Sequence, residues 1–302
     1  MKKSYLYIVL AAFFWGCIGI FFKQLAFIGF TAMQIVAIRC TIAALVMVAF
    51  LLLSNRGALR IRIRDLWYFI GTGIVSLVFF NWCYFCAIEY SSLGVAAVLL
   101  YTSPVFVTVL SAVFFRERIT WIKLTALVLT LLGSILVAGI LGQASDGISL
   151  YGILLGVGSG LGYALYSIFG RIALTKYAPI TVTTYTFLFA ALCALPLSGL
   201  HHALFLFSLP SVWGNSLGMG ILCCALPFLL YTKGLDQVET GKAAIMATLE
   251  PAVATAIGIL FYGETLSWLK ILGIGLIFLS IVLLNCRLSS RCGALSSLSK
   301  RC

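Results

Sequence analysis

The chain has 302 residues, of which 63% are hydrophobic and only 9% are charged, and its mean hydropathy is +1.15. A soluble domain carries roughly 25% charged residues, so this composition excludes an ordinary soluble enzyme and leaves no room for a separate soluble domain. The formal net charge of +12 would suggest a nucleic-acid partner in a soluble protein, but the positions of the charges give it another explanation.

Apolar runs of 18 or more residues predict an all-α polytopic membrane protein with ten transmembrane helices. In chain order the predicted spans are 5–22, 32–53, 67–88, 93–115, 121–141, 150–170, 180–200, 212–232, 241–262 and 267–286. The first run follows Lys2 and Lys3, as in a signal peptide. It is long for such a peptide and has a counterpart in the second half, so we expect it to remain a span. The basic, Ser-rich segment 287–302 is expected to be a disordered cytoplasmic tail.

The basic residues between these spans predict the orientation of the chain. With the N-terminus in the cytoplasm, 17 of the 20 Lys and Arg fall on cytoplasmic segments, Lys23 and Lys270 fall on the other face, and Arg39 lies within a span. Cytoplasmic loops are enriched in Lys and Arg, so we predict that both termini are cytoplasmic. The net charge is thereby explained without a nucleic-acid partner.

An internal repeat relates the two halves of the sequence at an offset of 147 residues. Residues 94–136 align without gaps to residues 241–283, with 12 identities in 43 positions. The identities that carry weight in an apolar sequence are Gly94/Gly241, Pro104/Pro251, Glu117/Glu264, Trp121/Trp268 and Lys123/Lys270. Five predicted spans separate the copies, and an odd number places the second copy in the opposite orientation. Inverted repeats of this kind are typical of secondary transporters, whose binding site lies between the halves.

Two ionisable residues lie deep inside predicted spans, Glu250 and Arg39. Glu250 is roughly 14 Å from the cytoplasmic edge at the helical rise of about 1.5 Å per residue, close to the midplane. We predict that it contacts substrate or carries a coupling proton, because intramembrane carboxylates mark functional pathways; a structural acid is the alternative. Arg39 is expected to be structural, by snorkelling outward, capping a helix or pairing with a carboxylate.

Pro104 and Pro251 occupy equivalent mid-span positions in the two halves. Proline removes a backbone hydrogen bond and kinks a helix, so we predict a pair of hinges, with a static kink as the alternative. Glu117 and Glu264 each close a span and are expected to form ion pairs or helix caps at the membrane interface.

Polar and aromatic residues at apolar depth make up the candidate substrate-binding set. Trp15 in the first span aligns with Tyr163 in the sixth, and we predict that these two side chains face each other's halves across a central cavity. The full predicted set is Trp15, Asn81, Tyr101, Ser103, Tyr163, Tyr231 and Glu250. Each residue alone fits a helix-packing or interfacial role better than ligand contact, and the prediction rests on the set.

Several short motifs point to one family. They are Trp15-Gly16, Ser103-Pro104, Leu249-Glu250-Pro251 and Gly263-Glu264, within two five-span halves at about 5–138 and 150–285. The chain thereby resembles the EamA-type, ten-span members of the drug/metabolite transporter superfamily. The resemblance implies a bacterial plasma-membrane carrier that moves metabolites, amino acids or drugs, commonly outward, through a cavity between its halves.

The alternatives to a secondary transporter are an intramembrane enzyme and a channel. Neither His201 nor His202 belongs to an HExxH-type zinc motif. Eight of the ten cysteines lie inside or at the ends of apolar runs and are expected to behave as small buried hydrophobes, and Cys83 and Cys86 form a CxxC whose alternative role is a redox pair or half a zinc site. No selectivity-filter sequence and no Walker motif is present. We therefore expect no metal and no cofactor, a small-molecule substrate and the lipid bilayer as partners, and a monomer that can form the pathway alone, with a homo-oligomer left open.

Overall fold

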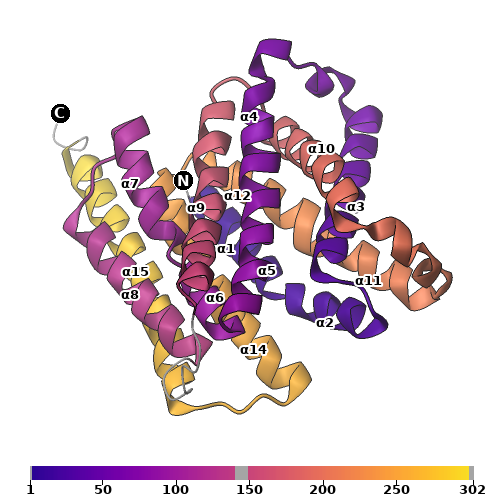
Figure 1. The fold of residues 1–302 in the computed structure, drawn as a ribbon. Coiled ribbons are helices and arrows are strands. Elements are labelled where there is room, and N and C mark those ends of the chain that lie inside the picture. The colour runs from indigo at the N-terminus through magenta and orange to yellow at the C-terminus, as the bar shows by residue number, and fades with distance from the viewer. Residues whose placement is uncertain (1, 140–148, 299–302) are drawn as a thin grey trace.

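The computed structural model describes the backbone of residues 2–139 and 149–298, and the side chains of residues 3–139 and 149–284. Within these ranges the chain is helical, with no strand (Figure 1). An all-α structure is what an apolar environment requires, because a helix satisfies its backbone hydrogen bonds internally.

The helices follow one another with short connections in both halves. The first half contains α1 (Lys2–Gly16), α2 (Ile18–Ile28), α3 (Ala32–Ser54), η1 (Arg56–Leu59), η2 (Ile63–Asp65), α4 (Leu66–Ile70), η3 (Gly71–Val78), α5 (Phe79–Tyr90), α6 (Leu93–Leu100), α7 (Ser103–Phe115) and α8 (Trp121–Ala138). The second half contains α9 (Leu150–Ala173), α10 (Pro179–Ser198), η4 (Leu200–Ser208), α11 (Pro210–Gly220), η5 (Ile221–Ala225), α12 (Leu226–Leu235), α13 (Thr240–Ala247), α14 (Glu250–Tyr262) and α15 (Trp268–Leu298). Segments η3 and η5 are π-helical, and η1, η2 and η4 are 3₁₀-helical.

Nine stretches of the described chain are long and apolar enough to cross a membrane, and they correspond to the first nine predicted spans. The tenth predicted span, 267–286, corresponds to the apolar stretch Trp268–Leu284 of α15. The chain is therefore an all-α polytopic membrane protein, as predicted. Its surface agrees with this assignment, since large apolar side chains such as Phe27 (93% exposed) and Leu53 (88% exposed) point outward, where lipid would cover them.

Three local features differ from the prediction. The first span is longer than 5–22, runs from Lys3 to Ile28, and is interrupted at Cys17 between α1 and α2. A 3₁₀ segment, η4, occupies the connection around His201 and His202. The expectation of a disordered tail at 287–302 is wrong for its backbone as far as Leu298, because α15 continues to that residue; the last four residues lie outside the described chain.

The helix bounds of the second half repeat those of the first at the offset of 147 residues. Helices α6 and α13 correspond residue for residue, as do α7 and α14, and both π-helical segments fall at equivalent places in the third and eighth spans. Packing follows the same relation: α5 packs on α9 while α12 packs on α1, and the equivalent helices α3 and α10, and α8 and α15, pack on each other. Figure 1 shows α8 and α15 running side by side.

Helices α8 and α15 approach closely because each carries a glycine at their contact. A Cβ built on Gly133 would lie 2.8 Å from the carbonyl oxygen of Gly273, and a Cβ on Gly273 would lie 2.7 Å from that of Gly133. Small residues allow this backbone approach between membrane helices.

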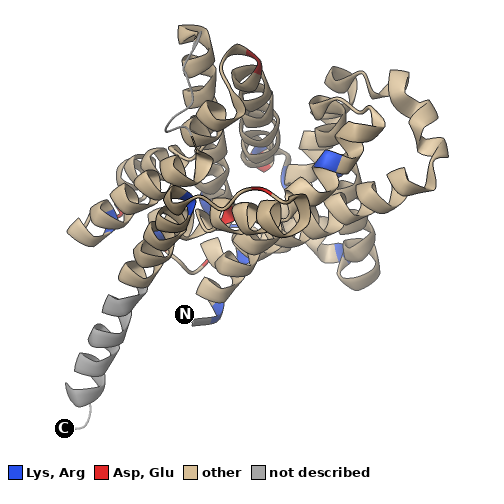
Figure 2. Cartoon of the chain, turned by 90° about the horizontal axis from the view of Figure 1, so that it is seen from below, with Lys and Arg blue, Asp and Glu red and all other residues tan. Residues whose placement is uncertain are grey.

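The described connections gather on two faces of the helical bundle. We call "the basic face" the one that carries segments 54–66, 116–120, 174–178 and 236–239, and "the opposite face" the one that carries 29–31, 91–92, 199–209 and 263–267. Hydrogen bonds join segments within one face: Lys176 Nζ lies 2.7 Å from Asp65 Oδ1 on the basic face, and Gln34 Nε2 donates to the carbonyl oxygen of Gly199 (3.4 Å) on the opposite face. Viewed from below, the ribbon carries few charged positions (Figure 2).

Candidate functional site

The fourth and ninth spans are both broken near their middles. Helix α6 ends at Leu100 and α7 begins at Ser103, while α13 ends at Ala247 and α14 begins at Glu250. Pro104 and Pro251 lie in the first turns of α7 and α14, where the missing N–H of proline costs no helical hydrogen bond. The two prolines therefore mark helix starts inside the spans. Whether these starts act as hinges stays a prediction.

A narrow cavity lies at the centre of the bundle. Its lining comes from four spans: Trp15 on α1, Ser76, Leu77 and Phe80 on η3 and α5, Tyr163, Tyr166 and Ser167 on α9, and Phe228 and Tyr231 on α12. The free volume of the cavity is about 10 Å³, roughly the space that one water molecule needs. A metabolite can therefore enter this site only if the surrounding helices move.

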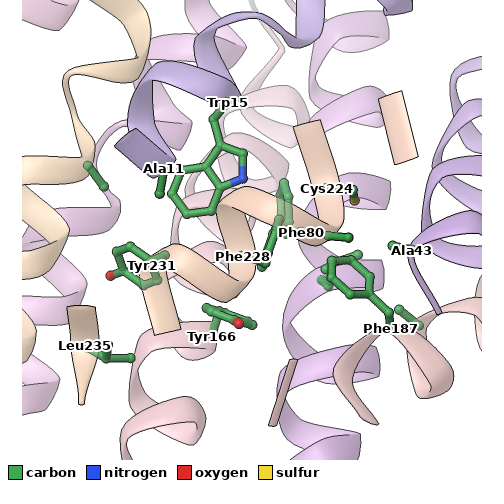
Figure 3. Packing of buried hydrophobic residues seen from close by; sticks show 14 of the residues in the cluster. Ala11, Trp15, Ala43, Phe80, Tyr166, Phe187, Cys224, Phe228, Tyr231 and Leu235 are labelled. Atoms are coloured by element: carbon green, nitrogen blue, oxygen red, sulfur yellow. The ribbon is translucent and has the colours of Figure 1, made fainter. Parts of the chain in front are cut away.

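Trp15 is the centre of the aromatic cluster. Its ring centroid lies 5.1 Å from that of Phe228, 5.3 Å from Tyr231 and 6.4 Å from Tyr163. These separations fall in the range of favourable aromatic pairs. Figure 3 shows the indole with its nitrogen at the ring edge, among Phe228, Phe80 and Tyr231. The indole Nε1 is buried and has no hydrogen-bond partner among the described residues, so this site holds one unused donor.

The tyrosine hydroxyl groups around the cavity are held by polar partners on neighbouring helices. Tyr166 shares a hydrogen bond of 2.7 Å with Thr232 Oγ1, and the hydroxyl of Tyr231 shares one of 2.8 Å with Ser167 Oγ. These bonds tie α9 to α12 and fix the rings that face Trp15. The remaining tyrosine, Tyr163, donates to Glu250 Oε2 over 3.4 Å, a long hydrogen bond.

Glu250 stands at the first residue of α14, next to the cavity. Its carboxylate is partly buried, and Tyr163 links it to the aromatic lining. The glutamate is favourably placed at a helix N-terminus, where the helix dipole stabilises negative charge. Among the described residues no basic side chain lies within ion-pair distance of it.

Arg39 is buried (7% exposed) in the middle of α3. Its Nη2 donates to Asn81 Oδ1 over 2.8 Å, and Asn81 Nδ2 in turn donates to the carbonyl oxygen of Leu77 (2.7 Å). Arg39 Nε is buried and finds no hydrogen-bond partner in the part of the chain that the structure describes. The arginine therefore does not snorkel to the membrane surface, and it forms no ion pair within the described chain. Of the three roles suggested by the sequence, snorkelling and pairing with a carboxylate are thereby removed.

The structure brings together part of the predicted site and separates the rest. Trp15, Tyr163 and Tyr231 line the cavity, and Glu250 adjoins it. Asn81 does not line the cavity but anchors Arg39. Tyr101 and Ser103 are at the break between α6 and α7, and Ser103 is buried there.

Six cavity residues lie outside the seven-residue candidate set, namely Ser167, Phe228, Ser76, Leu77, Phe80 and Tyr166. Helical spacing could have found the first two. Ser167 follows Tyr163 by four residues and Phe228 precedes Tyr231 by three, so each shares a helix face with a candidate. Phe80 carries no comparable signal, because the adjacent π-helical segment changes the register of its helix face.

Glu117 forms both of the interactions that the sequence suggested for it. Its Oε1 accepts from the backbone N–H of Thr240 (2.6 Å) and its Oε2 from that of Gly241 (3.2 Å), which caps α13. Lys123 Nζ lies 3.3 Å from the same carboxylate. The equivalent Glu264 forms ion pairs with Lys270 (3.4 Å) and Lys23 (3.5 Å), but it has no helix-capping contact among the described residues.

An all-helical membrane protein whose broken spans meet beside an aromatic cavity belongs to the class of membrane transporters. The model of the EamA-like transporter family matches this chain twice, over residues 2–139 and 150–286, and the chain therefore belongs to that family. The family resemblance is confirmed, and the chain is a transporter of small metabolites, not an enzyme.

Curated relatives agree with this membership, and a solved structure shares the fold. An uncharacterized transporter of Archaeoglobus fulgidus is 30% identical over 70% of this chain and 75% of its own length. The threonine/homoserine exporter RhtA of Escherichia coli K12 is 30% identical over 80% of this chain and 78% of its own. A protein known by its crystal structure shares the fold with a TM-score of 0.79 at 19% identity, covering 96% of this chain and 99% of that one.

Proposed function

We propose that this protein is a secondary exporter of small amino-acid-like metabolites, working by alternating access between two inverted five-helix repeats, 5–138 and 150–285. The substrate-binding residues in this proposal are Trp15, Tyr163, Tyr231 and Glu250. The observation that carries it is the contact between Tyr163 and Glu250, because it joins an aromatic cavity to a carboxylate at the broken ninth span.

The chemistry of the site favours a substrate with a cationic and an apolar part. A carboxylate near the midplane can hold an ammonium group, and the faces of Trp15 and the tyrosines can hold a cationic or apolar moiety, at about 0.5–2 kcal/mol per contact. The orphan indole nitrogen of Trp15 adds one donor for a substrate oxygen. An amino acid offers all three groups, and the family relative RhtA is named as an exporter of two of them.

The size of the cavity supports alternating access over an open pore. A free volume of about 10 Å³ does not admit an amino acid, so transport requires rearrangement at the broken spans. Matching breaks at Pro104 and Pro251 in equivalent spans provide places where such a rearrangement can occur in both halves.

The proposal also covers the orientation of the chain in the plasma membrane and its oligomeric state. The basic face is the cytoplasmic one, because Lys and Arg are enriched in cytoplasmic loops, and both termini then lie in the cytoplasm of a cell bounded by this plasma membrane. One chain contains both repeats and therefore the complete pathway, so a monomer is sufficient and an oligomer is not required.

The test is transport by purified protein in proteoliposomes loaded with threonine, homoserine or larger amino acids, with and without a pH gradient. Glu250→Gln keeps the size and hydrogen bonding of the side chain while it removes the charge. We expect it to abolish accumulation driven by a pH gradient, and to weaken exchange if the carboxylate also contacts the substrate.

Glu89→Gln is the matched control, because Glu89 is exposed near the end of α5 and has no ion pair in the described chain. It should transport like the wild type. Wild-type transport by Glu250→Gln in both conditions would reduce Glu250 to a structural residue, and failure of every amino acid to be transported would overturn the proposed substrate class.

A further inference from the structure

Two equivalent clusters of charged side chains and backbone N–H groups lie on the two faces of the bundle. The cluster on one face joins the two halves of the chain, and its equivalent on the other face does not. The cluster on the basic face contains Glu117, Lys123 and the first residues of α13. Its equivalent on the opposite face contains Glu264, Lys270 and the first residues of α6. Three of the twelve identities in the internal repeat, Gly94/Gly241, Glu117/Glu264 and Lys123/Lys270, fall in these clusters.

On the basic face, the cluster ties the two halves of the chain together. Glu117 follows α7 in the first half and accepts hydrogen bonds from Thr240 N (2.6 Å) and Gly241 N (3.2 Å) at the start of α13 in the second half. Lys123 lies between two carboxylates, 3.3 Å from Glu117 and 2.7 Å from Glu239, and its side chain is only 3% exposed. Position 241 packs closely here, since a Cβ built on Gly241 would be in van der Waals contact with Thr108 Oγ1 at 3.4 Å and with Glu117 Oε2 at 3.6 Å.

On the opposite face, the equivalent parts are present but apart. Glu264 keeps the ion pair with Lys270 (3.4 Å), as Glu117 does with Lys123, but its side chain is 42% exposed. The residues equivalent to Thr240 and Gly241 are Leu93 and Gly94, whose backbone N–H groups have no protein acceptor in the described chain. Leu93 is 64% exposed, whereas Thr240 is fully buried.

Both clusters contain the same glutamate, lysine and glycine, but Ser92 and Leu93 stand on the opposite face where the basic face has Glu239 and Thr240. The shared residues therefore do not explain the contrast in docking. The contrast reflects the arrangement of the helices: α13 is docked against α7 on the basic face, while α6 is not docked against the end of α14 on the opposite face. An inverted repeat has two such docking sites, and a carrier that alternates closes one of them at a time.

We propose that these clusters are a pair of exchangeable latches between the halves. The Glu117 latch holds the pathway closed on the basic face in the state described here. In the alternate state Glu117 releases α13, and Glu264 accepts hydrogen bonds from Leu93 and Gly94, which closes the opposite face. The inference rests on the alternating access in the proposed function, and it adds the groups that hold each state.

The latches can communicate with the central site through their helices. Helix α13 leads from the Glu117 latch directly to the break before Glu250, and α6 leads from Leu93 to the break at Tyr101. Docking or release at either face therefore moves the half-helix that ends beside the aromatic cavity. Glu117 and Glu264 are positioning residues in this scheme and do not contact the substrate.

The experiment measures cysteine reactivity at one probe for each face, in purified full-length protein in nanodiscs, where a water-soluble maleimide reaches both faces. Ser111→Cys reports on the basic face, because Ser111 is buried (1% exposed) beside Gly241. Leu93→Cys reports on the opposite face. Labelling is quantified for each peptide by mass spectrometry, so that the native cysteines can remain.

Matched variants of the two latches should shift the reactivity of the probes in opposite directions. Glu117→Gln should raise the labelling rate at position 111 and lower it at position 93, and Glu264→Gln should do the reverse. Because the variants weaken hydrogen bonds and an ion pair of a charged group, we expect a change of about tenfold in the ratio of the two states. Equal shifts in both variants, or no shift, would overturn the proposal.

A second measurement keeps the test decisive if Glu117→Gln does not fold. A double variant with cysteines at positions 93 and 264 should form a disulfide on oxidation, because the closed opposite-face latch brings these residues together, and position 111 should then become reactive. Failure to form the disulfide would contradict the latch. None of these measurements uses a substrate, so they remain valid if the proposed substrate class is wrong.

Discussion

Arg39 shows at the scale of one residue how this protein tolerates a buried charge. A charge within a span costs at least about 2.5–3.5 kcal/mol on the lenient insertion scale. The guanidinium has the Asn81 carbonyl oxygen at 2.8 Å as its acceptor, and Asn81 is itself fixed by the Leu77 carbonyl. Both residues were singled out in the sequence, but Asn81 was predicted to bind substrate. The amino-acid sequence alone does not reveal that α3 and α5 bring Arg39 and Asn81 together.

Asn81→Leu should therefore destabilise the fold. It leaves a buried guanidinium without its acceptor, and the loss of a hydrogen bond to a charged group corresponds to about 1.5–3 kcal/mol. The measurement is thermal unfolding of the purified protein in detergent, with Asn215→Leu as the control, since Asn215 forms only an exposed bond to the Ser211 carbonyl. Equal unfolding temperatures for the two variants would contradict the role assigned to Asn81.

Glu239, between α12 and α13, makes the stability of the protein at the basic-face latch depend on pH. Burial raises the pKa of this carboxylate, but hydrogen bonds and charges from Lys123 and Lys242 outweigh burial and hold the pKa below its ordinary value of 4.5. Since the folded-state pKa is the lower one, Glu239 stabilises the fold above the unfolded-state pKa, and this contribution is lost as the pH falls through the folded-state pKa.

We thus expect the free energy of unfolding of the wild type to fall as the pH drops below the ordinary carboxylate pKa of 4.5, and to fall less steeply in Glu239→Gln. Chemical unfolding at a series of pH values measures both slopes. Glu89→Gln provides a control for the loss of a carboxylate as such. Identical slopes for Glu239→Gln and the wild type would show that its contacts with Lys123 and Lys242 contribute nothing to folding.

At the scale of the helix, close packing beside the breaks is set by small residues. Gly16 ends α1 against the start of α14: a Cβ there would lie 2.6 Å from the side chain of Val253 and 3.0 Å from the carbonyl oxygen of Glu250. Gly19, one turn away on α2, has no atom within 4 Å of its Cβ position. These two glycines therefore form a natural comparison.

Gly16→Ala should push the start of α14, which carries Glu250, away from α1 and Trp15 and destabilise the protein by about 1–3 kcal/mol, as extra methyl groups do in packed interiors. Gly19→Ala should be neutral or slightly stabilising, because glycine inside a helix costs about 0.5–1 kcal/mol relative to alanine. Unfolding temperature and transport rate together measure the effect. Similar losses in both variants would show that helix propensity, and not the contact with α14, governs this region.

Hydropathy located the spans but not their interruptions. The predicted spans 32–53, 93–115 and 241–262 agree closely with Ala32–Ser54, Leu93–Phe115 and Thr240–Tyr262, because each depends only on the sum of apolar side chains over about 20 residues. The same sum does not register a change in backbone hydrogen bonding. Pro104 and Pro251 indicated two of the breaks, since proline lacks an N–H, whereas the break at Cys17 and the two π-helical segments had no signal in the residues.

The cavity was predictable only where the repeat or the residue type supplied information. Alignment of the halves paired Trp15 with Tyr163, and the structure places their rings 6.4 Å apart. The depth of Glu250 followed from counting residues along its span. Phe80 was out of reach, because phenylalanine is common on every face of a membrane helix and only the packing of α5 brings this ring to the centre.

At the scale of the whole molecule, the described connections separate into two faces in the pattern that ten spans require. Connections predicted to share a side contact one another: Lys176 binds Asp65, and Arg171 donates to the carbonyl oxygens of Asp236 (2.9 Å) and Leu235 on one face. On the other face, Lys23 pairs with Glu264. One miscounted span would have put partners of these pairs on opposite sides of the membrane.

This arrangement leads to a prediction about orientation in the cell. With the basic face in the cytoplasm, Arg60→Cys, in the connection between η1 and η2, should resist a membrane-impermeant maleimide applied to intact cells and react after permeabilisation. His201→Cys, in the η4 connection, should react in intact cells. Peptide-level mass spectrometry distinguishes these positions from the ten native cysteines. Labelling of position 60 in intact cells, together with protection of position 201, would invert the assignment of the faces and with it the direction of every latch movement proposed here.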